Sequence, residues 1–245
     1  MKRFFDPVTI LLLLFLAYSS LTGGKFDSPL DWLMETLLFL PGILIALSFH
    51  EFAHAVVAYK SGDHTPKLQG RVTLNPVAHI DPFGFLCILF IGFGWGKPVM
   101  VDPRNFKSRK RDDILVSLAG VTMNLLLAIV FAIVFTILAK TAPGFLNFSS
   151  IGETINIIIH YIISINLILM VFNLLPIPPL DGFNLVSEIL NIKYTETYYK
   201  IYQNGMWILM GLILLSNMTS VNVLGVIFGH TAAPLFYFLT HLYLW

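Results

Sequence analysis

The apolar positions of this chain are gathered into long stretches, which predict membrane-spanning helices. A helix that crosses a bilayer needs roughly 17–25 mostly apolar residues. Candidate stretches cover residues 7–22, 30–59, 114–139, 154–175, 199–215 and 221–244, and the last contains Gly229 and Pro234 as points where a helix can break. The predicted fold class is therefore an all-α polytopic membrane protein with about six transmembrane helices.

Two stretches depart from this simple pattern. Residues 7–22 are short and follow Lys2 and Arg3, so a cleaved signal peptide is an alternative to a retained helix. Residues 83–99 are apolar but interrupted by glycines, and their apolar run of about 14 residues is short for a span. We expect this second stretch to form a re-entrant or β-hairpin segment.

The overall composition agrees with a membrane protein and argues against other classes. Hydrophobic residues make up 56% of the 245 residues, and charged residues make up only 12%. Such an apolar chain is not expected to be disordered, and the near balance of 15 Lys and Arg against 14 Asp and Glu argues against nucleic acid as a partner. Cys87 is the only cysteine, which excludes an internal disulfide and a cysteine-rich zinc site.

The basic residues predict the orientation of the chain, because cytoplasmic loops of membrane proteins are enriched in Lys and Arg. With six spans and a cytoplasmic N-terminus, every Lys and Arg except Lys25 and Lys140 falls on the cytoplasmic side. The basic stretch from Arg104 to Arg111 fits this rule as a membrane-surface anchor. We therefore expect the N-terminus on the cytoplasmic side.

The most informative polar residues within the predicted spans are His50, Glu51 and His54. Ionisable groups inside a membrane are costly and therefore point to function. Residues four apart on a helix share one face, so both imidazoles can hold one metal ion, and Glu51 lies close enough to take a proton from a water molecule. The alternative is a pair of satisfied core histidines beside a paired glutamate. Three such groups in one otherwise uncharged stretch favour a metal site.

A catalytic zinc site requires a third protein ligand, for which depth in the membrane narrows the choice. At about 1.5 Å per residue, His50 lies about 27 Å along its span, toward the cytoplasmic side. Asp181, just beyond the inner end of the fourth span, has a compatible depth, and Glu188 remains a weaker alternative. His160 and Glu153 lie too far toward the outer side, while His64 and His79 are interpreted as solvated loop residues.

The segment 173–182, Asn-Leu-Leu-Pro-Ile-Pro-Pro-Leu-Asp-Gly, cannot continue a helix because its three prolines lack N–H donors. We expect an extended backbone with unpaired carbonyl groups, which is tolerated at membrane depth where it lines a cavity. Such a strip could pair with an extended peptide. A proline-rich end to a span is the simpler alternative, but the presence of Asp181 in the segment favours a site.

Taken together, these residues resemble the site-2 protease family of intramembrane zinc metalloproteases, peptidase family M50. The resemblance covers about residues 40–190, and one departure is Val121, where many members have proline. It is carried by His50-Glu51-x-x-His54, Asn173-x-x-Pro176-x-Pro178-x-x-Asp181-Gly182, Gly120-x-x-x-Asn124, and the loop sequences 74–82 and 94–99, which are similar to those of compact prokaryotic members.

The resemblance implies a role for each matched residue. One Zn²⁺ would be held by His50, His54 and Asp181, Glu51 would be the general base, and Asn173 would help to hold the scissile carbonyl or its oxyanion. Asn75 and Asn124 either contact the substrate or brace loops.

The resemblance also implies an organisation for the chain. We expect a single membrane-embedded metalloprotease domain over residues 1–245, with a catalytic core at about 30–190. Peripheral helices at 7–22 and 199–244 would then gate access of the substrate, and no inserted PDZ-like domain or CBS pair is expected.

The predicted function is hydrolysis of peptide bonds in or near transmembrane segments of membrane proteins, by a zinc metalloendopeptidase of a prokaryotic cell membrane. Its partners would be a transmembrane protein substrate and the lipid bilayer, with no nucleic acid, and the sequence leaves the oligomeric state open. One alternative is a catalytically silent relative that binds membrane proteins. A metal or proton transporter is less favoured, since the sequence contains no internal repeat.

Overall fold

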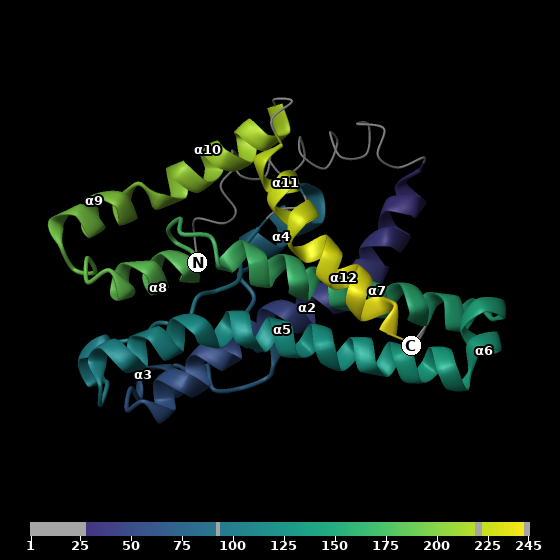
Figure 1. Cartoon of the computed structure of the whole chain (residues 1–245), viewed down its shortest axis with the longest axis horizontal. Coiled ribbons are helices and arrows are strands. Elements are labelled where there is room, and N and C mark those ends of the chain that lie inside the picture. Colours follow the sequence, from purple (N-terminus) through teal and green to yellow (C-terminus); the bar gives the residue numbers. More distant parts are fainter. Residues whose placement is uncertain (1–27, 92–93, 219–221, 243–245) are drawn as a thin grey trace.

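The computed structural model of the chain describes residues 28–91, 94–218 and 222–242 (Figure 1). The first expected span, residues 7–22, lies outside the described residues. Within them, the chain is helical, with one isolated antiparallel bridge. The helices are α2 (Pro29–Lys60), α3 (Thr65–Leu68), η1 (Pro76–Ala78), α4 (Pro82–Ile91), η2 (Pro103–Asn105), α5 (Arg109–Thr141), α6 (Pro143–Phe148), α7 (Ser150–Asn173), α8 (Asp181–Ile189), α9 (Glu196–Gln203), α10 (Gly205–Met218), α11 (Val223–His230) and α12 (Ala232–Thr240).

The expected all-α membrane fold is confirmed. Among the described residues, α2, α5, α7 and the α11–α12 stretch are long and apolar enough to cross a membrane. The break between α11 and α12 falls at Thr231, between the two residues at which a break was expected. The expected span at 199–215 is instead divided at Asn204 into α9 and α10. With 14 residues, α10 is about 21 Å long, which is shorter than the ~30 Å hydrocarbon core of a bilayer.

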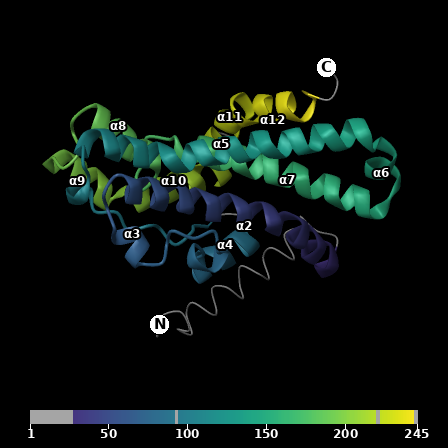
Figure 2. The ribbon, with the colours of Figure 1, turned by 90° about the horizontal axis from the view of Figure 1, so that it is seen from below.

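Helices α2, α5 and α7 pack against one another and form the centre of the molecule. Figure 2 shows α5 and α7 joined through α6, with α2 alongside them and α12 lying over α5 and α7. Small residues allow the helices to approach closely, as is common in membrane proteins. In α2, a Cβ atom at Gly42 would lie 2.6 Å from Ile165 Cδ1 and 3.3 Å from the Tyr161 backbone in α7, so a larger residue would require Ile165 to move. Ala128 and Ala132 of α5 are also fully buried.

Among its described residues, 83–91 and 94–99, the segment at residues 83–99 is helical at its start and contains no strand, so the β-hairpin that was one of its two expected forms is not found there. The side chain of Asp81 accepts a hydrogen bond from the Gly84 N–H at 2.8 Å, which caps the first turn of α4. Beyond α4, Gly96 forms an antiparallel bridge with Ile80. The chain therefore enters α4 just after Ile80 and is beside Ile80 again at Gly96, as expected for a re-entrant segment.

The C-terminal end of α2, the N-terminal end of α5 and the C-terminal end of α7 lie at the same end of the three-helix core (Figure 1). This arrangement follows from the connections, because α2 and α7 both run antiparallel to α5. The basic residues Lys60, Arg109, Lys110 and Arg111 lie at this end. Helix α8 packs on α5 there, which brings Asp181 toward His50 and His54.

Candidate metal centre

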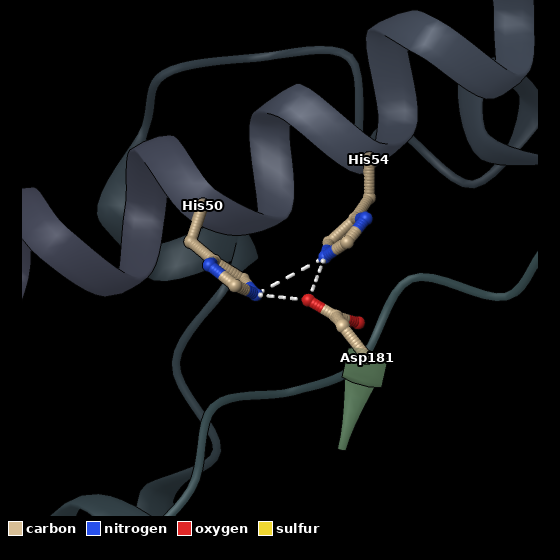
Figure 3. Close-up of side chains that lie close together, drawn as sticks. All are labelled: His50, His54 and Asp181. Atoms are coloured by element: carbon tan, nitrogen blue, oxygen red, sulfur yellow. Dashed lines mark hydrogen bonds and ion pairs between the residues drawn. The ribbon is translucent and has the colours of Figure 1, made fainter. Parts of the chain in front are cut away.

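Three side chains from two helices converge at one buried point (Figure 3). His50 and His54 project from successive turns of α2, and Asp181 is the first residue of α8. Asp181 Oδ2 lies 3.2 Å from Nε2 of each histidine, and the two Nε2 atoms are 3.0 Å apart. The structure thus brings together the two motif histidines and the aspartate chosen by depth. Among the described residues, this group includes Asp181 and not Glu188.

The hydrogen bonds behind the histidines determine which ring nitrogen carries the proton. His50 Nδ1 lies 2.6 Å from the Asn124 side-chain oxygen, and His54 Nδ1 lies 2.7 Å from the Val116 carbonyl oxygen. Both oxygens can only accept, so both Nδ1 atoms donate, and in the neutral imidazoles both Nε2 atoms present lone pairs. Asp181 Oδ2 is buried and accepts no hydrogen bond, so it presents a third lone pair at the same point.

Three converging lone pairs repel one another unless a cation lies between them. Such a set of three donors is typical of a metal site. Nitrogen and oxygen ligands bind zinc at about 2.0–2.2 Å, so two ligands at a tetrahedral angle lie about 3.3–3.5 Å apart. The observed separations of 3.0–3.2 Å are close to these values. The three side chains therefore fit one small tetrahedral ion and leave one position open.

The space beside the ligands depends on Gly120 of α5. A Cβ atom at this position would lie 2.4 Å from His50 Cε1 and 2.5 Å from Nε2 of both His50 and His54. Any larger residue would therefore collide with both imidazoles at their metal-binding nitrogens. The glycine of the Gly120-x-x-x-Asn124 motif is thus required by close approach to the ligands.

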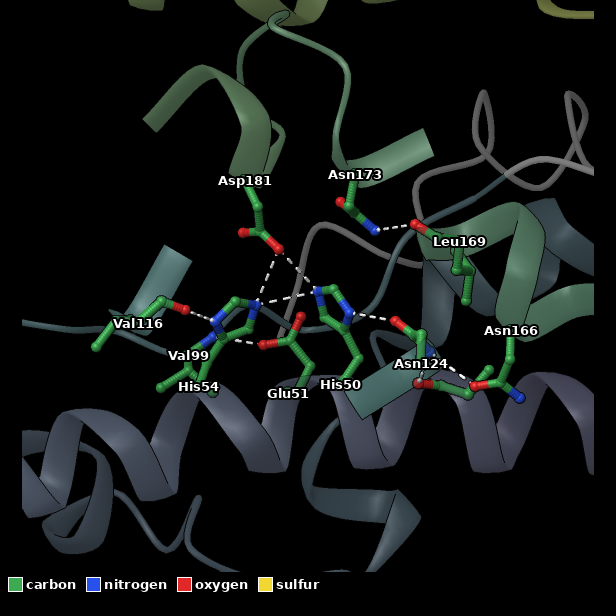
Figure 4. A network of polar contacts seen from close by, with 11 residues as sticks. His50, Glu51, His54, Val99, Val116, Asn124, Asn166, Leu169, Asn173 and Asp181 are labelled. Carbon is green, nitrogen blue, oxygen red and sulfur yellow. Dashed lines mark hydrogen bonds and ion pairs between the residues drawn. The ribbon is translucent and has the colours of Figure 1, made fainter. Parts of the chain in front are cut away.

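Asn124 braces a ligand from the interior of the protein. Its side chain is fully buried, and its amide group donates to the Ala46 carbonyl at 3.2 Å and to Asn166 Oδ1 at 2.8 Å (Figure 4). These donors direct the Asn124 oxygen toward His50. Asn124 is not among the described residues that line the cavity, and its contacts are with helices α2 and α7 and not with a loop. Asn166 was not singled out from the sequence, although an asparagine in the middle of an apolar helix was a signal that could have found it.

An Asn124→Leu variant is expected to lower zinc affinity about 10–100-fold, because outer hydrogen bonds orient metal-binding histidines. Zinc competition with a chelator of known affinity would measure the change. Asn156→Leu is a matched control, because Asn156 also lies in a spanning helix and its buried Oδ1 has no hydrogen-bond partner. Wild-type affinity in a folded Asn124→Leu protein would contradict the bracing role.

Glu51 and Asn173 both line the cavity that contains the ligands, which has a volume of about 470 Å³. The Glu51 carboxylate lines the cavity together with the two imidazoles (Figure 4), and its Oε2 accepts a hydrogen bond from the Val99 N–H at 3.0 Å. Asn173, the last residue of α7, donates one amide hydrogen to the Leu169 carbonyl at 3.1 Å. Its second amide hydrogen is available to a molecule in the cavity.

Asn75 lies elsewhere, on an exposed loop. Its side chain accepts a hydrogen bond from the Val77 N–H at 3.1 Å and caps η1. It is not among the described residues that line the cavity. The structure therefore gives Asn75 a local structural contact, which agrees with the bracing alternative.

The proline-rich connection between α7 and α8 differs from the expected extended strip. Residues 174–180 form successive turns, in which the N–H groups of Leu175, Ile177 and Leu180 bond to nearby carbonyls. The residues between the prolines still have N–H donors, and these favour local turns over an open edge. Pro179 lines the cavity, so the segment does contribute to the site. Residues 97–101 have no regular secondary structure, and Pro98 to Val101 also line the cavity.

The remaining cavity wall comes from residues that the sequence motifs did not indicate. Asp113 of α5 and Lys193 form a buried ion pair with a separation of 2.6 Å. Tyr194 donates to Asp113, and partial desolvation together with that carboxylate raises the pKa of Tyr194 to about 12, so its hydroxyl keeps its proton. Tyr198 and Tyr202 of α9 complete this wall. No sequence pattern links these residues to the site, because only the packing of α8 on α5 brings them there.

Comparison with known proteins gives one family and several relatives. The model of Peptidase family M50 matches residues 38–216. "Putative zinc metalloprotease YwhC" of Bacillus subtilis is 43% identical over 147 residues, which cover 60% of this chain and 66% of that protein. "Putative zinc metalloprotease Rip2" of Mycobacterium tuberculosis is 34% identical over 167 residues, covering 66% of this chain and 60% of the relative. The chain thus spans 60–66% of the length of these two relatives. No solved structure matches the chain significantly.

Proposed function

This chain belongs to peptidase family M50, and from that membership we propose that it is a zinc metalloendopeptidase that hydrolyses peptide bonds in or near transmembrane segments of membrane proteins. The observation that carries the proposal is the convergence of three lone pairs from His50, His54 and Asp181 beside the Glu51 carboxylate. The relatives named zinc metalloproteases support zinc as the ion.

The residues of the cavity supply the groups that peptide hydrolysis requires. A bound zinc ion would lower the pKa of water toward about 7 and polarise the scissile carbonyl. Glu51 would take the proton of the attacking water and deliver it to the leaving amine. Asn173 would donate its second amide hydrogen to the developing oxyanion.

The position of the cavity supports a membrane protein substrate. His50 lies ten residues before the end of α2, which places the site about 15 Å from the basic end of the core. We take this basic end as cytoplasmic and the membrane as a prokaryotic cell membrane. A substrate helix must unwind locally to expose its amides, and the irregular segment at residues 97–101, which lines the cavity, could lie beside the unwound strand. The core at about residues 30–190 would form one domain with the peripheral helices.

Exchanging the third ligand tests the proposal. Asp181→Ala is expected to lose bound zinc and cleavage of a transmembrane peptide, because two histidines leave the ion without its third ligand. Glu188→Ala, on the same helix, should keep both properties. Metal content by mass spectrometry and cleavage in detergent micelles or nanodiscs would be measured for each. Full zinc binding in Asp181→Ala would exclude this ligand set, and zinc binding without cleavage in the wild type would favour a silent relative.

A further inference from the structure

A buried ion pair lies in the cavity wall but has no part in the proposed chemistry. The Lys193 ammonium is 2.6 Å from Asp113 Oδ2, and each side chain is less than one tenth exposed. The Tyr194 hydroxyl donates to the same carboxylate at 3.3 Å. Burial of two charges carries a desolvation cost, and such a pair is best explained where it fixes one geometry.

The loop that contains Lys193 is held against the first turn of α5. Asn191 and Tyr194 have φ angles of 57° and 69°, in the left-handed region that residues other than glycine seldom adopt. Lys110 donates to the Asn191 side chain at 2.6 Å, and the Arg109 guanidinium lies 4.4 Å from the centre of the Tyr194 ring. Strained backbone persists where surrounding contacts fix it, so this loop has a defined position on α5.

The same loop is bonded to the helix that begins with Asp181. The backbone N–H groups of Ile192 and Lys193 both donate to the Ser187 carbonyl, at 3.0 and 3.1 Å. Ser187 lies in α8, six residues after Asp181, which corresponds to about 9 Å along a helix. A continuous chain of contacts therefore runs from Asp113 through Lys193 and α8 to the third ligand.

Helix α5 also fixes the other two ligands. The Val116 carbonyl and Asn124 orient His54 and His50, and Gly120 lets their rings approach. We propose that the Asp113–Lys193 pair is a positioning contact for Asp181, which holds α8 on α5 so that the carboxylate meets both histidines and thereby sets metal affinity. The inference rests on the proposed metal site, but not on peptide hydrolysis.

Lys193→Met tests this inference, because it keeps an unbranched side chain, one atom shorter than lysine, and removes its charge. We expect zinc affinity to fall about 10-fold or more, as for other outer-shell partners of metal ligands. The visible absorption of the cobalt-substituted protein should also change, since Asp181 would approach the ion differently. Lys193→Arg keeps the ion pair and should restore most of the affinity. Lys110→Met is the matched control, because Lys110 contacts the same loop. Its zinc affinity should stay within about twofold of the wild type, since the exposed Lys110–Asn191 hydrogen bond contributes little to stability.

The measurements use the full chain in nanodiscs, with zinc competition, cobalt absorption and thermal unfolding for each variant. A folded Lys193→Met protein with wild-type affinity and absorption would overturn the inference and leave the proposed function intact. An equal loss of zinc affinity in Lys110→Met would also overturn the inference. If Lys193→Met does not fold, Asp113→Glu lengthens the contact by one methylene group and keeps the charge, and unchanged affinity and absorption there would overturn the inference. A wild-type protein that binds no metal would overturn both proposals.

Discussion

A Glu51→Gln variant is expected to bind zinc as the wild type does and to cleave a membrane substrate about 10²–10⁴ times more slowly. This range is the usual contribution of a general acid–base group. Glutamine retains an acceptor oxygen for the Val99 N–H, so the wall at residues 97–101 should keep its position. It cannot take up a proton from water at neutral pH. Single-turnover cleavage of a transmembrane peptide, together with metal content, would separate these two effects.

Glu35→Gln is a matched control for this experiment. Glu35 lies on the same helix, is exposed, and makes only a long contact of 3.5 Å with the Tyr161 hydroxyl. The control should cleave at the wild-type rate. Comparison of membrane-protein fragments in cells that express wild type or Glu51→Gln would then reveal the natural substrates. Normal cleavage by zinc-loaded Glu51→Gln protein would show that another group is the base.

Gly120→Ala is expected to reduce cleavage at least about 100-fold, although alanine favours helix formation. The added methyl group would lie 2.4–2.5 Å from atoms of both imidazoles, so the rings must move by about 1 Å. A displacement of that size commonly costs about 10²-fold in rate. Because α5 gains about 0.5–1 kcal/mol of helix stability from this change, loss of the helix does not explain the effect. Cleavage rate and zinc affinity are the measurements.

Gly211→Ala provides the matched substitution in another helix. A Cβ atom at Gly211 in α10 would have no atom within 4 Å, so this variant should keep full zinc affinity and cleavage. Thermal unfolding of both variants would compare their folds. If Gly120→Ala retained both zinc and activity, the close approach of α5 to the ligands would have no functional importance.

The sequence predicted the elements whose signals are local. A long apolar stretch must form a helix in lipid, because its backbone groups have no water to bond. This reasoning found α2, α5, α7 and the α11–α12 stretch. The i, i+4 spacing then placed His50 and His54 on one face without knowledge of the fold. Depth along the spans favoured Asp181 over Glu188 as the third ligand.

Other features could not be read from local patterns. The turns at residues 174–180 depend on hydrogen bonds among residues between the prolines, and the sequence suggested an extended strip. The division of residues 199–215 at Asn204 was also not indicated by their apolar character. The contacts of Asn166 with Asn124, and of Lys193 with Asp113, join residues 42 and 80 positions apart, for which a single sequence has no period or spacing rule.

By itself, the sequence determined the class of the protein, four of its long apolar helices and the chemical identity of the side chains proposed to bind metal. These properties follow from apolar length and from the spacing of side chains along one helix. Only the tertiary structure decided that α5 passes close enough to orient both imidazoles, and that Asp181 reaches them from α8. The physical reason is that ligand geometry and proton position depend on contacts between helices, which packing sets to within a fraction of an ångström.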